Sequence, residues 1–302
     1  MICSKPFASR GALFGCGQCT PCRVNRRRQW TWRQWFESLT HEENCFVTLT
    51  YAPGLEPCNP SHLPGAGHLD PDHLRLFFYR LRKALYPQRI RYFACGEYGD
   101  QNSRPHYHLT LFGVSGATLV LGPQGPEPFP QTAARIWAKG HVQVGDFNEV
   151  TAQYVAGYVV KKWTAKDDPR LKGRPPEFSR MSLRPGIGTD AMATVAAALI
   201  NLPSGSDVPN TLQVGRRKIP LGRFLLKKLR IAAGFSDEKI SQIKQEKTDE
   251  TATELLALFQ AALATAPPAS PITLKSVYLQ EVAQKIRQVE TRSKIYSSTR
   301  KL

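Results

Sequence analysis

The stretch Arg89–Val114, RIRYFACGEYGDQNSRPHYHLTLFGV, decides the fold, because it contains two strand-like runs joined by a turn-rich DQNSRP. Side chains two residues apart in a strand share one face, so His106 and His108 are expected to project together. Glu97 ends the first run, and its carboxylate can reach both imidazoles if the two runs pair as a hairpin. Two polar side chains on a half-exposed strand are the alternative interpretation.

Further elements are predicted on both sides of this hairpin. The run 45–53, CFVTLTYAP, alternates apolar and hydroxyl residues as a strand does. In the run 70–85, DPDHLRLFFYRLRKAL, Asp70 and Pro71 are typical of the start of a helix. Helices are also predicted over 23–39, 132–139, 151–163 and 273–296, and a strand over 141–147. The order of these elements predicts an α+β fold, with a central antiparallel sheet and packed helices.

The charge of the chain points to a polyanionic partner. Its 302 residues include 41 Lys and Arg against 24 Asp and Glu, a formal net charge of +17, and such a field attracts nucleic acid. No apolar run approaches the roughly 20 residues that are needed to span a membrane. The N-terminus lacks the pattern of a secretory leader, so we expect the protein to act in a reducing cytoplasm.

Seven cysteines in such a compartment are expected to be thiols or metal ligands rather than disulfides. Cys16, Cys19 and Cys22 follow one another with two residues between them, and Cys3 is available as a fourth thiolate. Four thiolates suit a structural Zn²⁺ site. An iron–sulfur cluster ranks second, because no further cysteine followed by proline comes in time. Unligated buried thiols are the third interpretation.

The helix predicted after the cysteines is basic and aromatic. Its arginines suit contacts with phosphates, and its tryptophans either pack inward or stack on bases. The candidate DNA-binding residues are Arg23, Arg26, Arg27, Arg28 and Arg33. The basic segments 161–184 and 216–230 would extend this surface.

A second group of reactive side chains lies in residues 153–162, QYVAGYVVKK. A helix places Tyr154 and Tyr158 on one face, because they are four residues apart. Lys161 follows Tyr158 closely enough to stabilise a phenolate or the negative charge at a phosphate under attack. Two neutral imidazoles and a carboxylate would complement them by binding a divalent cation that polarises the phosphate. Ordinary amphipathic packing is the alternative explanation of the tyrosines.

The order and spacing of FVTLTY, CGEYG, RPHYHLTLFG and YVAGYVVKK resemble the HUH superfamily of rolling-circle replication initiators, in which two histidines flank a bulky residue. The Cys-x-x-Cys-x-x-Cys-Arg start, IRYFACGEYG and SRMSLRPGIG are similar, more narrowly, to the replication initiators of microviruses, especially of the gokushovirus-like branch. The resemblance covers about residues 16–188. It implies a sheet of about five antiparallel strands with the metal-binding histidines at its centre and the tyrosine helix alongside.

The resemblance also implies a reaction. The ligands of Mg²⁺ or Mn²⁺ would be His106, His108 and Glu97, and the catalytic residues would be Tyr158, Tyr154 and Lys161. Tyrosyl attack at the phage origin would leave a free 3′-hydroxyl and a 5′-phosphotyrosyl enzyme, which later rejoins the displaced strand. Some related initiators with two tyrosines repeat the lysine spacing after both. Here Gly157 stands where a lysine would follow Tyr154, so Tyr158 is the preferred nucleophile.

These inferences divide the chain into a Cys-rich segment with the basic helix (1–44), a nickase core (45–165), a basic loop-rich extension (166–235) and a helical tail (236–302). The expected partners are single-stranded and origin DNA in the cytoplasm of a bacterial host, and no membrane. The sequence contains no G-x-x-x-x-G-K-[ST] motif. A host helicase is therefore expected to open the duplex, and a host DNA polymerase to extend the 3′ end.

Three classes of function remain open at this stage. The first is a metal-dependent nicking and joining enzyme, which by its chemistry could also be a plasmid relaxase or a transposase. The second is a non-enzymatic, zinc-containing DNA-binding regulator, which leaves the histidine pair and the paired tyrosines without a purpose. The third is an RNA-binding module, which shares the architecture of sheet and helices. The aromatic run typical of RNA-recognition domains is absent, which disfavours the third class.

Overall fold

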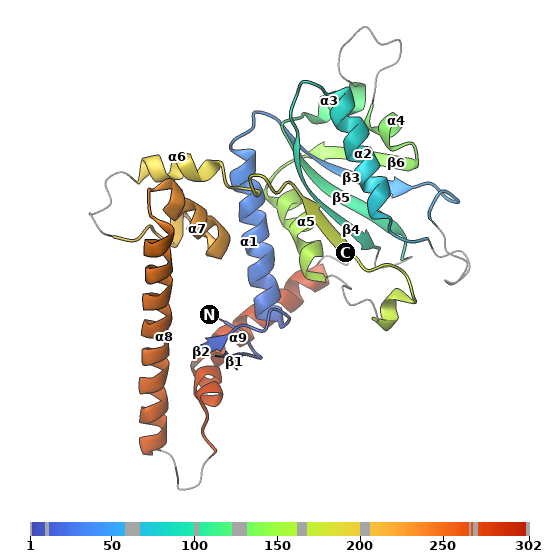
Figure 1. The fold of residues 1–302 in the computed structure, drawn as a ribbon. Helices are drawn as coiled ribbons and strands as arrows, with labels where there is room; N and C mark the ends of the chain where they lie inside the picture. The colour runs from blue at the N-terminus through green and yellow to red at the C-terminus, as the bar shows by residue number, and fades with distance from the viewer. Residues whose placement is uncertain are drawn as a thin grey trace. The chain divides into compact units, whose positions relative to one another are not determined.

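The computed structural model describes residues 2–9, 12–57, 67–99, 103–122, 132–161, 168–199, 206–265, 267 and 271–299, and it is an α+β structure (Figure 1). The chain forms two compact units. The first comprises Met1–Arg26, Leu199–Asn210 and Leu226–Leu302, and the second comprises Arg27–Ala198 and Thr211–Leu225. Each unit is assembled from segments that are distant in the sequence, whereas the predicted division followed the order of the chain.

The second unit is built on a five-stranded antiparallel sheet in the order β6-β3-β5-β4-β7. Its strands are β3 (Asn44–Tyr51), β4 (Arg91–Tyr98), β5 (Pro105–Phe112), β6 (Gly140–Asp146) and β7 (Phe178–Met181). The predicted hairpin is confirmed, because β4 pairs with β5. The strand β5, which carries both histidines, is the central strand. The edge strand β7 was not predicted from the sequence.

One face of the sheet carries the main apolar core. The helices α2 (Pro71–Ala84), α3 (Gly116–Leu121) and α4 (Ala133–Trp137) lie on this side (Figure 1). Alternate strand residues such as Leu49 and Leu109 are fully buried here against Phe77 of α2. Burying an apolar side chain of this size contributes roughly 1.5–3 kcal/mol. As predicted, Asp70 caps α2 by accepting a hydrogen bond from the Asp72 amide at 2.8 Å.

The opposite face is covered by α1 (Thr20–Ser38) and α5 (Glu149–Lys161). Gln34 of α1 joins the layers, because it accepts a hydrogen bond from Thr110 of β5 at 2.8 Å and donates one to the Ala152 carbonyl of α5 at 3.3 Å. The helix α5 starts with a reciprocal cap, in which Thr151 N donates to Asn148 Oδ1 (3.0 Å) and Asn148 N to Thr151 Oγ1 (2.9 Å). Capping and packing outweigh the lower helix propensity of its valines.

A buried carboxylate anchors α1 to the sheet. Glu37 is fully buried, forms an ion pair with Arg91 of β4, and accepts a hydrogen bond from the Gly188 amide at 2.6 Å. Burial alone would raise the pKa of Glu37, but its hydrogen bonds with His41, Arg91 and the Gly188 amide lower it below the ordinary value. The carboxylate therefore stays ionised in the folded protein at neutral pH.

We expect Glu37→Gln to lower the free energy of unfolding by about 3 kcal/mol, because Arg91 would lose its charged partner in a buried site. The carboxylate has a lower pKa folded than unfolded, where it is about 4.3. Its stabilisation is therefore complete above the unfolded pKa and is lost as the pH falls through the folded pKa. Urea unfolding at several pH values measures this, with Glu42→Gln, at an exposed position, as the control. A difference between wild type and Glu37→Gln that stays constant down to pH values below the folded pKa would contradict the assignment.

The second unit also contains the 3₁₀ helix η1 (Pro169–Leu171), α6 (Ala191–Ala198) and the hairpin of β8 (Thr211–Val214) and β9 (Arg217–Pro220). The helix α7 (Gly222–Ala232) spans the boundary between the units. The first unit contains the hairpin of β1 (Phe7–Ser9) and β2 (Ala12–Phe14), with α8 (Asp237–Thr265) and α9 (Leu274–Thr299). The helix predicted over 273–296 corresponds to α9. Among the described residues, no helix combines the length and the apolar character needed to cross a membrane.

Candidate functional site

The polar residues of the predicted hairpin lie on the face of the sheet that α5 covers. Strand register places His106 opposite Glu97 of β4 and opposite Thr50 of β3. The next row on the same face places His108 opposite Thr48 of β3. Because side chains alternate along a strand, both rows project toward α5. The sheet thus brings together the histidine pair and the carboxylate that the sequence suggested.

His108 is the centre of a buried hydrogen-bond network. Its Nε2 lies 3.0 Å from Glu97 Oε1, and its Nδ1 lies 3.0 Å from Thr48 Oγ1. Burial lowers the pKa of His108 to about 3, so the imidazole is neutral at pH 7. An ionised carboxylate can only accept hydrogen bonds, so in this arrangement Nε2 donates to Glu97 and Nδ1 accepts from the Thr48 hydroxyl.

His106 is half-buried and less well satisfied. Its Nδ1 is buried and has no hydrogen-bond partner among the described residues. Burial and the neighbouring His108 lower the pKa of His106, so its ring is also neutral at pH 7. The centroids of the two imidazole rings are 6.1 Å apart and their planes are nearly perpendicular, at 87°.

The chemistry of this group fits a divalent cation. Two neutral imidazoles and a carboxylate are suitable donors, and the unsatisfied Nδ1 of His106 is the kind of atom that an ion would satisfy. The three groups are not gathered into a closed ligand shell, because in the described part of the chain only the four cysteines place all their ligand atoms within 4.8 Å of one another. The predicted cation site is therefore compatible with the structure in chemistry and is not preassembled.

The two tyrosines of α5 pack directly on His108. The ring of Tyr158 stacks on the imidazole, with centroids 4.7 Å apart and an interplanar angle of 7°. The ring of Tyr154 stands edge-on to both, with its centroid 5.2 Å from that of His108 and 4.8 Å from that of Tyr158. The spacing of four residues thus does place both tyrosines on the face that meets the histidines.

The environment keeps Tyr158 protonated. Burial, the negative charge of Glu97, and hydrogen bonds with Tyr154 and Glu97 all raise the pKa of the Tyr158 phenol above its ordinary value. Tyr158 is buried, whereas Tyr154 is half-buried. Deprotonation of Tyr158 therefore requires positive charge near its oxygen. Lys161, predicted to supply such charge, is the last residue of α5, and its side chain lies outside the described residues.

Sequence reasoning missed two side chains of β3 that surround His108. Thr48 forms the hydrogen bond to Nδ1, and the ring of Phe46 lies 6.0 Å from the rings of both His108 and Tyr154. The alternation of FVTLTY does place residues 46, 48 and 50 on one face. The pairing of β3 with β5 was needed to show which threonine meets which histidine.

The predicted DNA-binding arginines have different surroundings. On α1, Arg23, Arg26 and Arg28 are exposed and Arg27 is half-buried. The guanidinium of Arg33 instead lies 4.0 Å from the ring centroid of Trp30 and 3.7 Å from that of Phe224, and its Nε donates to the Ile187 carbonyl at 3.0 Å. Burial lowers the pKa of Arg33 to about 10. Arg33 therefore packs within the fold, so DNA contact is proposed only for the other four arginines.

The tryptophans of α1 pack inward. Trp30 lies 4.9 Å from Phe93 of β4, measured between ring centroids, and Trp35 lies 5.8 Å from Trp32. Packing is thus the better of the two predicted interpretations for these rings.

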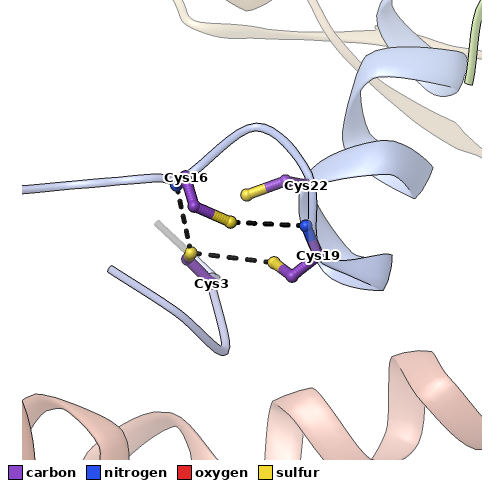
Figure 2. A group of neighbouring side chains, drawn as sticks. All are labelled: Cys3, Cys16, Cys19 and Cys22. Carbon is purple, nitrogen blue, oxygen red and sulfur yellow. Dashed lines mark hydrogen bonds between the residues drawn. The ribbon is translucent and has the colours of Figure 1, made fainter. Parts of the chain in front are cut away.

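The four predicted zinc ligands lie together in the first unit. The Sγ atoms of Cys3, Cys16, Cys19 and Cys22 all lie within 4.8 Å of one another, so the group could bind a metal ion such as zinc (Figure 2). Burial opposes ionisation of Cys19, but hydrogen bonds from the Cys22 backbone and from Ser4 outweigh it and lower the pKa of Cys19 to about 6. Cys19 is therefore mainly a thiolate at pH 7, which is the form that binds metal.

Comparison with known proteins places the candidate site within a recognised region. Residues 44–163 match the family of the replication-associated protein ORF2. This span starts at β3, ends just after α5, and includes all the proposed catalytic and cation-binding residues. No solved structure significantly matches the chain.

Three relatives are replication-associated proteins of small phages. The chain is 33% identical over 182 residues to replication-associated protein ORF2 of Spiroplasma virus 4, covering 57% of this chain and 55% of that protein. It is 28% identical over 227 residues to replication-associated protein VP4 of Bdellovibrio phage phiMH2K, covering 68% and 67%. It is 30% identical over 168 residues to replication-associated protein ORF4 of Chlamydia phage 1, covering 51% and 39%.

The matched region thus spans between about two fifths and two thirds of the length of these relatives. The predicted kinship is confirmed, because the family match and the three phage proteins agree. Residues 44–163 of this chain belong to the replication-associated protein ORF2 family, and the chain is similar to the replication-associated proteins of Spiroplasma, Bdellovibrio and Chlamydia microviruses.

Proposed function

We propose that the protein initiates rolling-circle DNA replication by nicking one strand at a phage origin through tyrosyl attack, and that it later rejoins the displaced strand. The packing of Tyr158 against His108, which is itself hydrogen-bonded to Glu97, is the observation that carries this proposal. It places a potential nucleophile beside potential cation ligands on the central strand. A role in replication also agrees with the names of the three relatives.

The reaction balances without nucleotide hydrolysis. The phenol oxygen of Tyr158 forms a bond to phosphorus, and the bond from phosphorus to the 3′ oxygen breaks. The phenol loses a proton and the departing 3′ oxygen gains one, so a 3′-hydroxyl and a 5′-phosphotyrosine result. The new ester keeps the energy of the broken phosphodiester, and attack by a 3′-hydroxyl on the phosphotyrosine reverses the step and joins two DNA ends.

Glu97, His106 and His108 are the residues that would hold Mg²⁺ or Mn²⁺. A bound cation would supply Lewis-acid polarisation of the scissile phosphate. The chain itself keeps both imidazoles neutral by burial, so that their nitrogen lone pairs are available. Thr48 orients the His108 ring through its hydrogen bond to Nδ1. Lys161 is proposed to stabilise the developing negative charge at the phosphate.

The paired tyrosines suggest that one chain can both begin and end a replication cycle. We assign the first attack to Tyr158, which packs flat on His108, and the second to Tyr154, which stands edge-on to both rings. Tyr154 would cleave the regenerated origin while Tyr158 still holds the 5′ end. The released end would then be rejoined into a circle.

The exposed and half-buried arginines Arg23, Arg26, Arg27 and Arg28 are proposed to contact DNA phosphates, as the net charge of +17 favours. The proposed partners are single-stranded and origin DNA, a host helicase and a host DNA polymerase, in the cytoplasm of the bacterial host. An HUH-endonuclease-like fold is proposed for the second unit, supported by the histidine pair on the central strand and the tyrosine helix packed on it.

Covalent capture of DNA tests the proposed function. The full chain is incubated with 3′-end-labelled single-stranded DNA from its own replicon in Mn²⁺ or Mg²⁺, and the products are run on a denaturing gel. The 3′ label is needed because the protein would keep the strand that follows the nick. We expect a labelled band that migrates with the protein. Strong binding without an adduct in either cation would favour the non-enzymatic DNA-binding regulator.

Thr48→Val should weaken Mn²⁺ binding by about tenfold, because valine keeps the shape of threonine but leaves His108 Nδ1 without its partner. Isothermal titration of the full chain with Mn²⁺, in the absence of DNA, measures this effect. Thr48→Ser retains the hydroxyl and is expected to bind nearly as tightly as wild type. Equal losses in the two variants would show that packing, and not the hydrogen bond, is responsible.

A further inference from the structure

The four cysteines of the first unit have the geometry of a site for a single ion. The sulfurs of Cys3 and Cys19 are 3.7 Å apart. In a tetrahedral tetrathiolate site with Zn–S distances of about 2.3 Å, neighbouring sulfurs are about 3.8 Å apart, because the edge of a tetrahedron is about 1.6 times the distance from its centre to a corner. A pair of sulfurs in such close contact leaves no room for a four-iron cluster between them.

The backbone around the cysteines supports negatively charged sulfur. The Cys16 amide donates to Cys3 Sγ at 3.3 Å, and the amides of Gln18 and Cys19 donate to Cys16 Sγ at 3.4 and 3.3 Å. Gly17 has φ +74°, a left-handed conformation that glycine adopts without strain, and this lets the loop turn tightly around Cys16. The six described cysteines of the chain form no disulfide.

The same cluster contacts the C-terminal helix of the first unit. The Cys3 amide donates a buried hydrogen bond of 3.0 Å to the hydroxyl of Tyr278, which belongs to α9 and lies 275 residues further along the chain. Cys3 is fully buried, and Tyr278 is 9% exposed. A residue that would be a metal ligand is thus also the residue whose backbone binds α9.

We propose that Cys3, Cys16, Cys19 and Cys22 bind one Zn²⁺ in a closed structural site, and that the metal-fixed position of Cys3 holds α9 through Tyr278. Four protein ligands leave no open coordination position, so the ion has a structural role and no catalytic one. The ion would close the loop from Cys3 to Cys16, which contains β1 and β2. Without it the four sulfurs lose their common centre, Cys3 is no longer fixed, and α9 loses its buried hydrogen bond.

Metal content and spectroscopy test the first half of this proposal. We expect the full chain, purified without added metal, to contain about one zinc per molecule. Replacement by Co²⁺ should give the intense visible bands of tetrahedral cobalt and a sulfur-to-metal charge-transfer band. Cys19→Ser should lose the zinc, whereas Cys45→Ser, at a buried cysteine of the second unit, should keep it. A folded wild-type chain that contains no zinc and gives no cobalt spectrum would overturn the site.

Hydrogen exchange tests the second half without relying on a cysteine variant. Removal of zinc by a chelator should speed amide exchange in α9 by on the order of tenfold, while α2 in the second unit keeps its rate. Tyr278→Phe should retain one zinc but still exchange faster in α9, because it loses only the hydrogen bond to Cys3. Unchanged exchange in α9, both after zinc removal and in Tyr278→Phe, would overturn the link between the metal and the helix. None of these measurements involves DNA cleavage, so their outcome is independent of the proposed nicking activity.

Discussion

Tyr158→Phe is expected to abolish the covalent protein–DNA adduct, with a loss of initial cleavage of at least about a thousandfold. Phenylalanine keeps the ring that stacks on His108 at 4.7 Å and removes only the oxygen that would attack phosphorus. The fold and the binding of DNA should therefore change little. The 3′-end-labelled DNA assay measures the adduct, and filter binding of the same DNA measures affinity.

Two further tyrosine variants make this prediction sharp. Tyr154→Phe should retain the first cleavage but fail to complete the second, so adduct forms while circular product does not. Tyr79→Phe removes an exposed phenol of α2, on the opposite face of the sheet, and should behave like wild type. If Tyr158→Phe formed as much adduct as wild type, the first attack would belong to Tyr154.

The second large effect is expected from the histidine pair. His106→Ala and His108→Ala should each reduce divalent-dependent cleavage by at least about a hundredfold, because each removes one imidazole from the proposed ligand set. Binding to DNA should stay within a few-fold of wild type, because it depends mainly on cationic side chains elsewhere. Cleavage at several Mn²⁺ concentrations and binding at several salt concentrations separate the two effects.

The control for this prediction is His141→Ala, which removes an exposed histidine from the edge strand β6. It should cleave as wild type does. Because His108 is buried, His108→Ala also creates a cavity, so its circular dichroism spectrum and melting temperature should be measured alongside. Cleavage by both histidine variants at the wild-type rate and the wild-type Mn²⁺ dependence would disprove the cation assignment.

These two experiments also separate the other classes of function that the sequence left open. A DNA-binding regulator would bind DNA in a salt-sensitive way, form no adduct, and be indifferent to the tyrosine and histidine variants. A relaxase or a transposase would form the same adduct, so these enzymes differ from a replication initiator only in the DNA that they cut. Cleavage of origin DNA from the chain's own replicon distinguishes the initiator from both.

The sequence by itself determined the features that follow from local periodicity. Alternation in residues 89–114 places His106, His108 and Glu97 on one face, because successive side chains of a strand point in opposite directions. A spacing of four residues places Tyr154 and Tyr158 on one side of a helix, because an α-helix has 3.6 residues per turn. Asp70 and Pro71 mark the start of α2 through local hydrogen bonding and a fixed φ. Each feature depends on residues close together in the chain.

Only the tertiary structure decided which distant residues meet. The hydrogen bond from Thr48 to His108 joins residues 60 positions apart, and the one from Cys3 to Tyr278 joins residues 275 apart. Arg33 shows the same limit, because its position in a basic helix predicted DNA contact, whereas Phe224 and the Ile187 carbonyl bind its guanidinium. Burial also decided the protonation of the site, since composition cannot show which imidazoles lie out of water. Local pattern thus fixed which side chains share a face, and packing between distant segments fixed what each of them contacts.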